Sequence, residues 1–296
     1  FNKNFSNKMN KKISLALSSG GARGLAHIGV IEVLLENNYK IEQISGSSIG
    51  SVVASMYASG ALIEFKNWVL SLDKLKVFSL MDFTIGGHGV MKGDKVFNKL
   101  KTIVDDQNIE DLKIPIKIIA TDAVNGKEIV FSKGGMYDAM RASCSIPGLV
   151  KPFVYNNTQL VDGGVLNPLP INHLCSPTQI LSVNLNETKT NIKNEKTKST
   201  TQSFENSYFK VLKEYFYFNK TNTKRLSFFD LTYKSIHLMQ NKLANEMLLR
   251  YPADYVVNIP FDSCYPLEFY KAKKMIKIGR DICAKALKNP TKKVIV

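Results

Sequence analysis

Short apolar runs and helical patterns alternate over the first sixty residues. Residues 13–18 are a short apolar run that ends in a glycine-rich turn, and residues 25–37 then carry apolar side chains at helical spacing. Residues 40–45 give a second short run, residues 46–50 form a second turn, and residues 52–60 follow with the small side chains of a packed helix. A strand, a sharp turn and a helix that occur twice in succession predict parallel βαβ packing.

Strands and helices continue to alternate further along the chain. The predicted elements are strands at residues 114–122, 128–132, 159–161 and 179–183 and a short helix at residues 136–145. Because strands alternate with helices, we expect an α/β domain from residue 10 to about residue 186. Nearer the C-terminus, residues 254–260 are typical of a last strand and residues 266–287 of an amphipathic helix.

The composition changes at residue 188. Residues 188–203 are polar and rich in lysine and threonine, which predicts a surface loop. Residues 204–249 are rich in aromatic side chains and are predicted to be helical, either packed on the sheet or acting as a lid. Core packing is the plainer explanation of most of these aromatic residues, and contact with acyl chains is the functional one. We expect a single domain over residues 10–290 that contains the segment 188–249.

The overall composition is that of a globular protein. The 296 residues are 44% hydrophobic and 22% charged, which excludes wholesale disorder. No apolar run approaches the ~18–20 residues needed to cross a bilayer. Residues 1–12 lack the apolar stretch of a secretory signal, and Met9 is a candidate natural start, so we expect a cytoplasmic protein.

Four cysteines show neither metal-ligand spacing nor the density of a disulfide framework, which predicts reduced thiols. They are Cys144, Cys175, Cys264 and Cys283. The expected compartment is therefore a reducing one.

The formal net charge of +15 indicates which kinds of partner the protein could bind. A basic surface attracts anionic partners such as phospholipid headgroups or nucleic acid. The sequence has neither an aromatic-interleaved basic strand nor zinc-finger spacing, so no nucleic-acid partner is expected. Two explanations of the charge remain open. The lysines either bring the protein to the anionic inner face of a membrane or only keep it soluble.

The pentapeptide Gly46-Ser47-Ser48-Ile49-Gly50 matches the G-x-S-x-G nucleophile elbow. A serine on a tight turn between a strand and a helix adopts strained dihedral angles, and flanking glycines let the neighbouring backbone pack without a Cβ clash. The N-terminus of the following helix also stabilises negative charge beside the serine oxygen. Three fixed positions in five occur often by chance. The assignment of Ser48 as a nucleophile therefore depends on the predicted strand before it and the helix after it.

A second glycine turn, Gly20-Gly21-Ala22-Arg23-Gly24, lies between the first predicted strand and a helix that we expect to begin near Ala22. Backbone N–H groups at such a junction point toward an anion. They would form an oxyanion hole in an ester hydrolase and a phosphate cradle in a nucleotide-binding protein. Neither a Gly-Lys-Ser/Thr sequence nor a full G-x-G-x-x-G is present, which disfavours the phosphate cradle. A glycine turn that only permits close packing is the remaining alternative.

Asp162 stands before Gly163 and Gly164 at the end of a short predicted strand, from which it could reach a serine on a neighbouring strand end. An ordinary Asp-Gly turn explains these three residues when they are considered alone. A hydrolase triad would need a histidine, and the histidines of this chain lie in no recognisable base motif. They are His27, His88, His173 and His237. A mechanism without histidine therefore fits better.

Taken together and in this order, the three motifs resemble the patatin-like phospholipases. The resemblance includes the turn at residues 20–24, the elbow at residues 46–50 and the Asp-Gly-Gly sequence at residues 162–164. It also includes residues 141–148, which look like the family's segment leading toward the aspartate. The match extends from about residue 12 to residue 173.

The resemblance implies a three-layer α/β/α sandwich with a mainly parallel central sheet. It implies that Ser48 attacks an acyl ester and that Asp162 accepts the serine proton directly. Burial should then raise the pKa of Asp162 above its ordinary value of ~3.9. The oxyanion would be held by the backbone of the glycine turn, namely Gly20, Gly21 and Ala22, with Arg23 nearby. This chemistry requires no metal ion and no cofactor.

Two positions depart from the family pattern. Ser19 stands where many members have a further glycine, and serine still allows the turn. Pro168 stands where an asparagine is frequent. Proline has no backbone N–H, so this change could alter the loop that positions Asp162.

The function implied by the resemblance is that of a phospholipase A or lysophospholipase acting on phospholipid, lysophospholipid or another acyl ester. An acyltransferase of similar fold is the enzymatic alternative, although its nucleophile normally pairs with a histidine. A non-catalytic membrane-associated module is the third hypothesis, and the intact Ser48, Asp162 and glycine turn argue against it. The head group, the acyl chain, the positional preference and the oligomeric state are not specified by the sequence.

Overall fold

Parallel β-structure forms the centre of the molecule, as the pattern of the first sixty residues predicts. The structure is a computed structural model that describes residues 11–84, 91–174, 178–187 and 228–291. Its eight-stranded sheet has the order β5-β6-β3-β2-β1-β7-β8, and β4 pairs with β3 outside this path. The strands are β1 (Lys11–Leu17), β2 (Tyr39–Ser47), β3 (Ile116–Asp122), β4 (Lys127–Phe131), β5 (Phe153–Tyr155), β6 (Thr158–Asp162), β7 (Gln179–Glu187) and β8 (Tyr255–Pro260).

The register of the parallel strands brings the two glycine turns together. Strands β3, β2, β1, β7 and β8 pair in parallel, whereas β4, β5 and β6 pair antiparallel. Leu17 of β1 lies opposite Gly46 of β2 and Val183 of β7. Because parallel strands end at the same edge of a sheet, the turn that follows β1 emerges beside Ser48, which follows β2.

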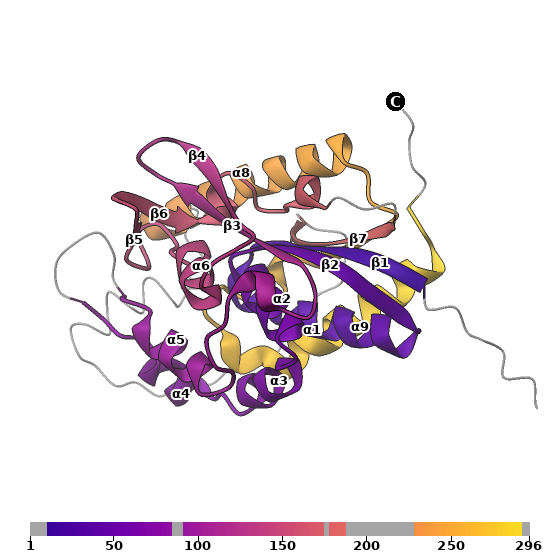
Figure 1. The fold of residues 1–296 in the computed structure, drawn as a ribbon, viewed down its shortest axis with the longest axis horizontal. Helices are drawn as coiled ribbons and strands as arrows, with labels where there is room; N and C mark the ends of the chain where they lie inside the picture. Colours follow the sequence, from indigo (N-terminus) through magenta and orange to yellow (C-terminus); the bar gives the residue numbers. More distant parts are fainter. Residues whose placement is uncertain (1–10, 85–90, 175–177, 188–227, 292–296) are drawn as a thin grey trace, which may run out of the picture.

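Helices cover both faces of the sheet. The α-helices are α1 (Ala26–Glu36), α2 (Ile49–Ala58), α3 (Leu62–Leu70), α4 (Lys74–Ser79), α5 (Asp94–Lys101), α6 (Met136–Ser143), α8 (Phe228–Arg250) and α9 (Ala272–Lys288). Figure 1 shows α8 on one side of the sheet and α1, α2, α3 and α9 on the other. The side chains of β1 alternate accordingly, since Leu15 and Leu17 belong to the main core while Ala16 packs in a second cluster with Ala244 of α8. The predicted three-layer α/β/α sandwich is confirmed.

Short 3₁₀ helices occupy the turns around the sheet. They are η1 (Gly21–Leu25), η2 (Ile109–Asp111), η3 (Gly163–Val165), η4 (Ile171–His173), η5 (Phe261–Ser263) and η6 (Phe269–Lys271). Two of them contain sequence motifs, because η1 includes most of the first glycine turn and η3 follows Asp162 directly. The local backbone of both motifs is therefore helical rather than extended.

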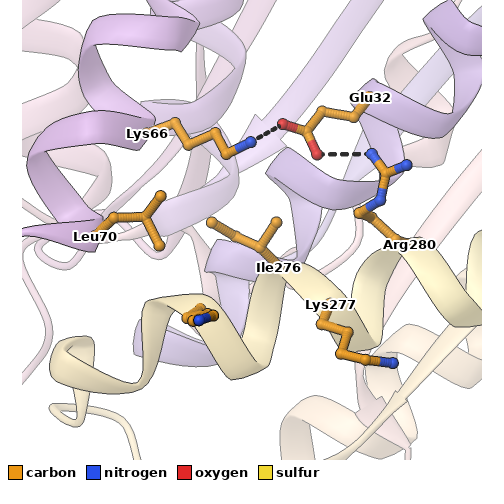
Figure 2. Close-up of a pocket in the computed structure, with 7 residues that line it drawn as sticks. Glu32, Lys66, Leu70, Ile276, Lys277 and Arg280 are labelled. Atoms are coloured by element: carbon orange, nitrogen blue, oxygen red, sulfur yellow. Dashed lines mark hydrogen bonds and ion pairs between the residues drawn. The ribbon is translucent and has the colours of Figure 1, made fainter.

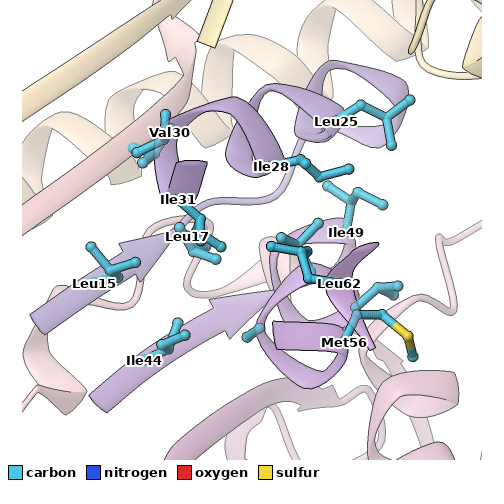
Figure 3. Packing of buried hydrophobic residues seen from close by; sticks show 14 of the residues in the cluster. Leu15, Leu17, Leu25, Ile28, Val30, Ile31, Ile44, Ile49, Met56 and Leu62 are labelled. Carbon is cyan, nitrogen blue, oxygen red and sulfur yellow. The ribbon is translucent and has the colours of Figure 1, made fainter. Parts of the chain in front are cut away.

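The main core lies between the sheet and the helices α1 and α2. Figure 3 shows side chains of β1, β2, α1 and α2 converging there, among them Leu17, Ile28, Ile44 and Ile49, which are all 7% exposed or less. Full burial of a side chain of this size contributes ~1.5–3 kcal/mol. The elbow serine is thus carried by a strand and a helix that the core fixes on both sides.

Helix α9 packs on α1 at close range because glycines meet the facing backbone. A Cβ on Gly29 of α1 would lie 2.1 Å from a carbonyl oxygen of α9. A Cβ on Gly279 of α9 would lie 2.1 Å from a carbonyl oxygen of α1. Neither position has room for a side chain, so both glycines set the spacing of the two helices.

Ion pairs join α1, α3 and α9 at the surface. Arg280 of α9 donates to Glu32 at 2.9 Å and to Glu36 at 2.7 Å, and Lys66 of α3 donates to Glu32 at 2.5 Å (Figure 2). Half-exposed pairs of this kind contribute ~0–1 kcal/mol each. They border a surface cavity of about 310 Å³ that none of the predicted site residues lines. The cavity is therefore separate from the candidate site.

The structure differs from several of the predictions made from the sequence. The helix predicted within residues 204–249 is present as α8, whereas residues 188–227, with the predicted loop, lie outside the described residues, so a lid there stays a prediction. Helices α3, α4 and α5 lie within residues 61–113, to which the sequence pattern assigned no element. Helix α9 begins at Ala272 rather than at residue 266.

Three of the four cysteines lie in the described part of the chain. Cys144, Cys264 and Cys283 are free thiols, and Cys175 lies outside the described residues. Within the described part of the chain, no group of three or more His, Cys, Asp or Glu side chains is placed to hold a metal ion. None of the described helices combines the length and the apolar character needed to cross a bilayer.

Candidate active site

Ser48 occupies a strained turn between β2 and α2. Its dihedral angles are φ 55° and ψ −126°, a region that residues with a side chain rarely adopt. The neighbouring glycines make the turn possible, because a Cβ on Gly46 would lie 2.6 Å from the backbone of Gly50. A Cβ on Gly50 would lie 2.2 Å from the carbonyl oxygen of Leu17 on β1. The sequence therefore places a serine where packing with two strands forces it into an exceptional conformation.

We expect Gly50→Ala to prevent this packing. The added methyl group would meet a backbone oxygen of β1 that has no room to move, so the variant should lose at least ~3 kcal/mol of stability or fail to fold. Gly135→Ala is a matched control, since its Cβ would meet nothing closer than 3.7 Å and its φ of −58° suits alanine. Urea unfolding of both variants tests the prediction. A Gly50→Ala protein as stable as wild type would contradict the close packing of the elbow on β1.

Backbone and hydroxyl groups hold the elbow from both sides. The amide N–H of Ser48 donates to Oγ of Ser143 at 2.8 Å, and this hydroxyl donates in turn to the carbonyl of Ile119 at 2.5 Å. The carbonyl of Ser48 accepts from the amide of Ser51 at 2.9 Å and from its hydroxyl at 2.6 Å. These bonds involve the backbone of Ser48, so its side chain is left to interact elsewhere.

The hydroxyl of Ser48 donates to Oδ2 of Asp162. Asp162 ends β6, which lies antiparallel to β3 with Asp162 opposite Ala120. Its other carboxylate oxygen accepts from the amide of Gly164 at 2.7 Å, and its own amide donates to the carbonyl of Ser145 at 2.9 Å. Both ends of the Asp162 carboxylate are therefore fixed, one by the following turn and one by the serine.

The glycines after Asp162 allow this close approach. A Cβ on Gly163 would lie 2.2 Å from the carbonyl oxygen of Ile119 on β3. A Cβ on Gly164 would lie 2.6 Å from Oγ of Ser19 in the first glycine turn. The Asp-Gly-Gly sequence is thus a point of contact with two other parts of the site, rather than an isolated turn.

Burial sets the basicity of Asp162. The side chain is 4% exposed, and removal from water raises its pKa from 3.8 to about 6. The hydrogen bonds from Ser48 and Gly164 act in the opposite direction and lower the pKa. Burial is the larger effect. Asp162 is therefore a stronger base than an exposed aspartate and is still ionised at neutral pH.

Cys144 lies beside this pair and was not singled out from the sequence. Burial, with a smaller effect of the charge of Asp162, raises the pKa of its thiol to about 12, although the charge of Arg141 and hydrogen bonds with Ser51 and Ser48 act in the opposite direction. The thiol is therefore protonated at neutral pH and cannot act as a thiolate nucleophile. Its position follows directly from helix α6, which ends one residue earlier at Ser143.

The first glycine turn presents two unpaired amides. Gly20 has φ 163°, and Gly21 has φ 57° in the left-handed region that favours glycine. Among the described residues, no hydrogen bond involves the amide N–H of Gly20 or of Gly21. The amide of Ala22, in contrast, donates to the carbonyl of Pro266 at 2.7 Å. Of the three amides expected to face an anion, the turn therefore leaves two available and uses the third to bind the loop before α9.

Packing brings this turn to the elbow. A Cβ on Gly24 would lie 2.2 Å from the side chain of Ile49, the residue that follows Ser48. The amide of Ser19 donates to the carbonyl of Pro168 at 2.9 Å, which ties the turn to the loop after Asp162. Pro168 thus supports the loop through its carbonyl, and the missing N–H does not break this connection.

The side chain of Arg23 contacts a cluster of polar and aromatic groups on α8 and η5. Its guanidinium donates to the hydroxyl of Tyr233 at 3.2 Å and to the carbonyl of Cys264 at 3.1 Å, and it lies 4.6 Å from the ring centroid of Phe261. These contacts connect η1 with α8 and η5. They engage the guanidinium of Arg23 away from the Ser48 hydroxyl, and the oxyanion role that the family resemblance implies for Arg23 stays a prediction.

The described histidines have partners other than Ser48. His27 hydrogen-bonds with the carbonyl of Ser18 at 3.0 Å, and burial lowers its pKa to about 4, so it is neutral. His173 contacts Glu128, and His237 stacks on Phe261. His88 lies outside the described residues. Among the described residues, the hydrogen-bond acceptor for the Ser48 hydroxyl is a carboxylate.

Comparison with known proteins identifies the family. The family model of Patatin-like phospholipase matches residues 15–174, more than half of the chain, and this segment includes both Ser48 and Asp162. The chain belongs to the patatin-like phospholipase family. It is accordingly a hydrolase that acts on ester bonds, and the resemblance predicted from the three motifs is confirmed.

Individual relatives extend this match. An uncharacterized NTE family protein of Mycobacterium tuberculosis is 31% identical over 93% of this chain and 91% of its own length. The lysophospholipase NTE1 of Candida glabrata is 31% identical over 54% of this chain and 9% of its own length. The lysophospholipase NTE1 of Kluyveromyces lactis is 32% identical over 55% of this chain and 12% of its own length. Among solved structures, VipD from Legionella pneumophila aligns with 94% of this chain and 67% of its own, at a TM-score of 0.49 and 15% identity.

Proposed function

We propose that this chain hydrolyses the acyl ester of a lipid, with Ser48 as nucleophile and Asp162 as its base. The observation that carries the proposal is the hydrogen bond from the Ser48 hydroxyl to the buried Asp162 carboxylate. A pKa of about 6 makes Asp162 more basic than an exposed aspartate while leaving it ionised at neutral pH. A general base needs both properties.

In the acylation step, Asp162 takes the proton of the Ser48 hydroxyl while Oγ forms a bond to the ester carbonyl carbon. The carbonyl oxygen becomes an oxyanion. When this tetrahedral intermediate collapses, the bond to the leaving alcohol breaks and Asp162 returns the proton to the alcohol oxygen. The products are an acyl ester on Ser48 and a free alcohol, which is a lysophospholipid when the substrate is a phospholipid and a glycerophosphodiester when it is a lysophospholipid.

In the deacylation step, water takes the place of the alcohol. Asp162 accepts a proton from the water, and the water oxygen bonds to the acyl carbon. The second tetrahedral intermediate collapses with cleavage of the bond to Oγ, and Asp162 returns the proton to Ser48. The fatty acid leaves, and the enzyme is restored without a metal ion or an organic cofactor.

The amides of Gly20 and Gly21 are the proposed oxyanion donors. Their lack of a partner within the described structure and the contact between Gly24 and Ile49 support this role, because the turn then lies next to the reacting serine. The N-terminus of α2, which begins at Ile49, adds a favourable dipole. Each donor aimed at the developing charge lowers the barrier by ~3–4 kcal/mol.

A lipid is the proposed acyl donor, either phospholipid, lysophospholipid or a related acyl ester. Two exposed apolar side chains, Val165 and Leu166, follow the Asp-Gly-Gly sequence and offer an apolar surface next to the candidate dyad. The names of the fungal relatives describe them as lysophospholipases. These relatives support a lysophospholipid as the first substrate to test.

Hydrolysis in water labelled with ¹⁸O tests the reaction class. We expect fatty acid released from a mixture of phospholipids and lysophospholipids to carry one ¹⁸O atom, because labelled water attacks the acyl-enzyme. Mass spectrometry of the acid and of the lysolipid measures this, with the same reaction in ordinary water as the control. Transfer of the acyl group to an added alcohol without labelled acid would indicate an acyltransferase. No change in any lipid would indicate a non-catalytic module.

A further inference from the structure

Three apolar side chains stand exposed together on α4 and the loop that follows it. Leu75 is 80% exposed, Phe78 42% and Phe83 39%. Leu75 and Phe78 are three residues apart on α4 and therefore lie on one face of the helix. The ring of Phe83 lies 5.8 Å from that of Phe78, centroid to centroid. The three side chains thus form one apolar cluster rather than scattered exposed residues.

Lysines surround this cluster. Lys74 and Lys76 flank Leu75 on α4 and are exposed. Lys95 donates to the carbonyl of Ser79 at 3.0 Å, at the end of α4. The amide of Lys92 donates to the carbonyl of Asp82 at 3.0 Å, next to Phe83. None of these four lysines forms an ion pair with a described residue. Lys76 also donates to the carbonyl of Ser71 at 2.9 Å, and the ammonium of Lys74 lies 5.4 Å from the ring centroid of Tyr270. Their positive charges are therefore not neutralised by any described carboxylate.

Two of the three aspartates of the same region accept hydrogen bonds from backbone amides. Asp73 caps α4 by accepting from the amide of Lys76 at 2.8 Å. Asp82 accepts from the amide of Gly93 at 2.6 Å and from that of Lys95 at 3.1 Å. Residues 73–84 and 91–101 together contain six lysines and three aspartates, a net charge of +3. The cluster is therefore apolar at its centre and basic at its rim.

Hydrogen bonds connect this region to the candidate active site. The amide of Met91 donates to the carbonyl of Leu149 at 2.9 Å, in the loop that follows α6. Arg141 of α6 donates to the carbonyl of Lys92 and, at 2.7 Å, to the hydroxyl of Ser145. The carbonyl of Ser145 in turn accepts from the amide of Asp162. Figure 1 shows α4 and α5 next to each other at one end of the molecule, with α6 between them and the sheet.

We propose that Leu75, Phe78 and Phe83, with Lys74, Lys76, Lys92 and Lys95, form a docking face for an anionic lipid bilayer. Exposed leucine and phenylalanine enter the boundary between head groups and acyl chains, and the lysines around them contact anionic head groups. An apolar centre within a rim of lysines matches the surface of an anionic bilayer, which presents acyl chains beneath negatively charged head groups. The purpose of docking, which is to bring lipid to Ser48, rests on the proposed function. Binding of the protein to the bilayer does not depend on catalysis.

Vesicle binding tests the docking face. The full chain carrying Ser48→Ala is sedimented with vesicles of phosphatidylcholine and phosphatidylglycerol or of phosphatidylcholine alone, so that no lipid is consumed. We expect the protein to bind the anionic vesicles and the Leu75→Ser, Phe78→Ser double variant to bind them at least tenfold more weakly. Binding should fall as the salt concentration rises. The Lys74→Gln, Lys76→Gln double variant should show a smaller dependence on salt. Ile63→Ser is the matched control, because this α3 side chain is 70% exposed and lies outside the docking face. It should bind within twofold of the parent.

Three results of this binding experiment would overturn the inference. The first is equal sedimentation with neutral and anionic vesicles. The second is no binding to either. The third is anionic binding that the paired Leu75 and Phe78 substitutions leave unchanged. A protein whose apolar cluster serves another macromolecule would give the second or third result.

Activity assays separate this inference from the proposed function. With Ser48 intact, the Leu75→Ser and Phe78→Ser pair should hydrolyse a soluble p-nitrophenyl ester within twofold of wild type, while release of fatty acid from anionic vesicles falls at least tenfold. Equal loss on both substrates would mean that the substitutions damage the active site, and would contradict a docking role. If wild type cleaves neither substrate but vesicle binding depends on the docking face, the proposed function fails and the docking inference stands.

Discussion

Replacing Ser48 with alanine is expected to lower ester hydrolysis by at least ~10⁴-fold, because the substitution removes the oxygen that attacks the acyl carbon. The fold should persist. The Ser48 side chain donates to Asp162, whereas the bonds to Ser143 and Ser51 that hold the elbow use the Ser48 backbone and survive in alanine. Turnover of a p-nitrophenyl ester, together with a thermal melt followed by circular dichroism, measures both expectations.

A buried serine on the helix that follows Ser48 provides the control. Ser55 is buried on α2, and its hydroxyl has no hydrogen-bond partner within the described structure. Ser55→Ala therefore also removes one buried hydroxyl, but not the one in the proposed chemistry, and its turnover should stay within twofold of wild type. If Ser48→Ala retains more than about one hundredth of wild-type turnover in a folded protein, Ser48 is not the nucleophile.

Local sequence signals predicted the parts of the fold that depend on neighbours in the chain. Both strand–turn–helix units of the first sixty residues are present. They could be predicted because a buried parallel strand is a continuous apolar run and the turn after it needs glycine. Gly46 and Gly50 illustrate why such motifs can be recognised in a sequence. At each position the backbone of a neighbouring segment leaves no room for a Cβ atom, so only glycine fits. The family resemblance followed from three such motifs in a fixed order.

Contacts between distant parts of the chain could not be predicted in this way. The amide of Ala22 is used by Pro266, and the guanidinium of Arg23 by Tyr233 and Cys264. The partners lie more than two hundred positions away, in segments with no motif of their own. The glycine turn was correctly located, but which of its groups remain available is decided by what packs against it.

Short helices also escaped prediction. Helix α4 has six residues and α5 has eight, so few positions carry the apolar spacing that distinguishes a helix from a loop. Their apolar residues serve different purposes, since Val77 is buried in the core and Leu75 is exposed. A pattern search that assigns all apolar residues to the core cannot recognise the docking face, which becomes visible only when exposure is known.

Replacing Asp162 with asparagine is expected to lower hydrolysis by ~10³–10⁴-fold, because an amide cannot accept the Ser48 proton. In the wild-type enzyme the carboxylate must be ionised to act. Its pKa of about 6 therefore predicts that kcat/KM is constant above about pH 7 and falls below pH 6 as the carboxylate is protonated. Rates measured from pH 5 to pH 9 on a soluble ester test this. A profile that is flat through pH 5 would contradict Asp162 as the base.

The same substitution should stabilise the protein at neutral and alkaline pH. The pKa of Asp162 rises from 3.8 to about 6 on folding, so its contribution to stability is fully present below pH 3.8 and is lost as the pH rises through 6. Above pH 7 the buried charge costs ~3 kcal/mol. Asparagine has no charge but loses one of the two hydrogen bonds of the carboxylate. We therefore expect Asp162→Asn to raise the free energy of unfolding by ~1–3 kcal/mol at pH 8, with a smaller or reversed effect at pH 5.

Asp122 is the matched control, because its pKa is shifted in the opposite direction. Hydrogen bonds from Asn125 and Thr158 lower that pKa to about 2, so the ionised carboxylate stabilises the fold above pH 3.8 and this contribution is lost as the pH falls toward 2. Asp122→Asn should therefore destabilise the protein at pH 8, where Asp162→Asn stabilises it. Urea unfolding of both variants at pH 5 and pH 8 provides the comparison. A loss of stability at pH 8 in both variants would mean that Asp162 is held by its hydrogen bonds and not strained by burial, which would remove the physical reason for its basicity.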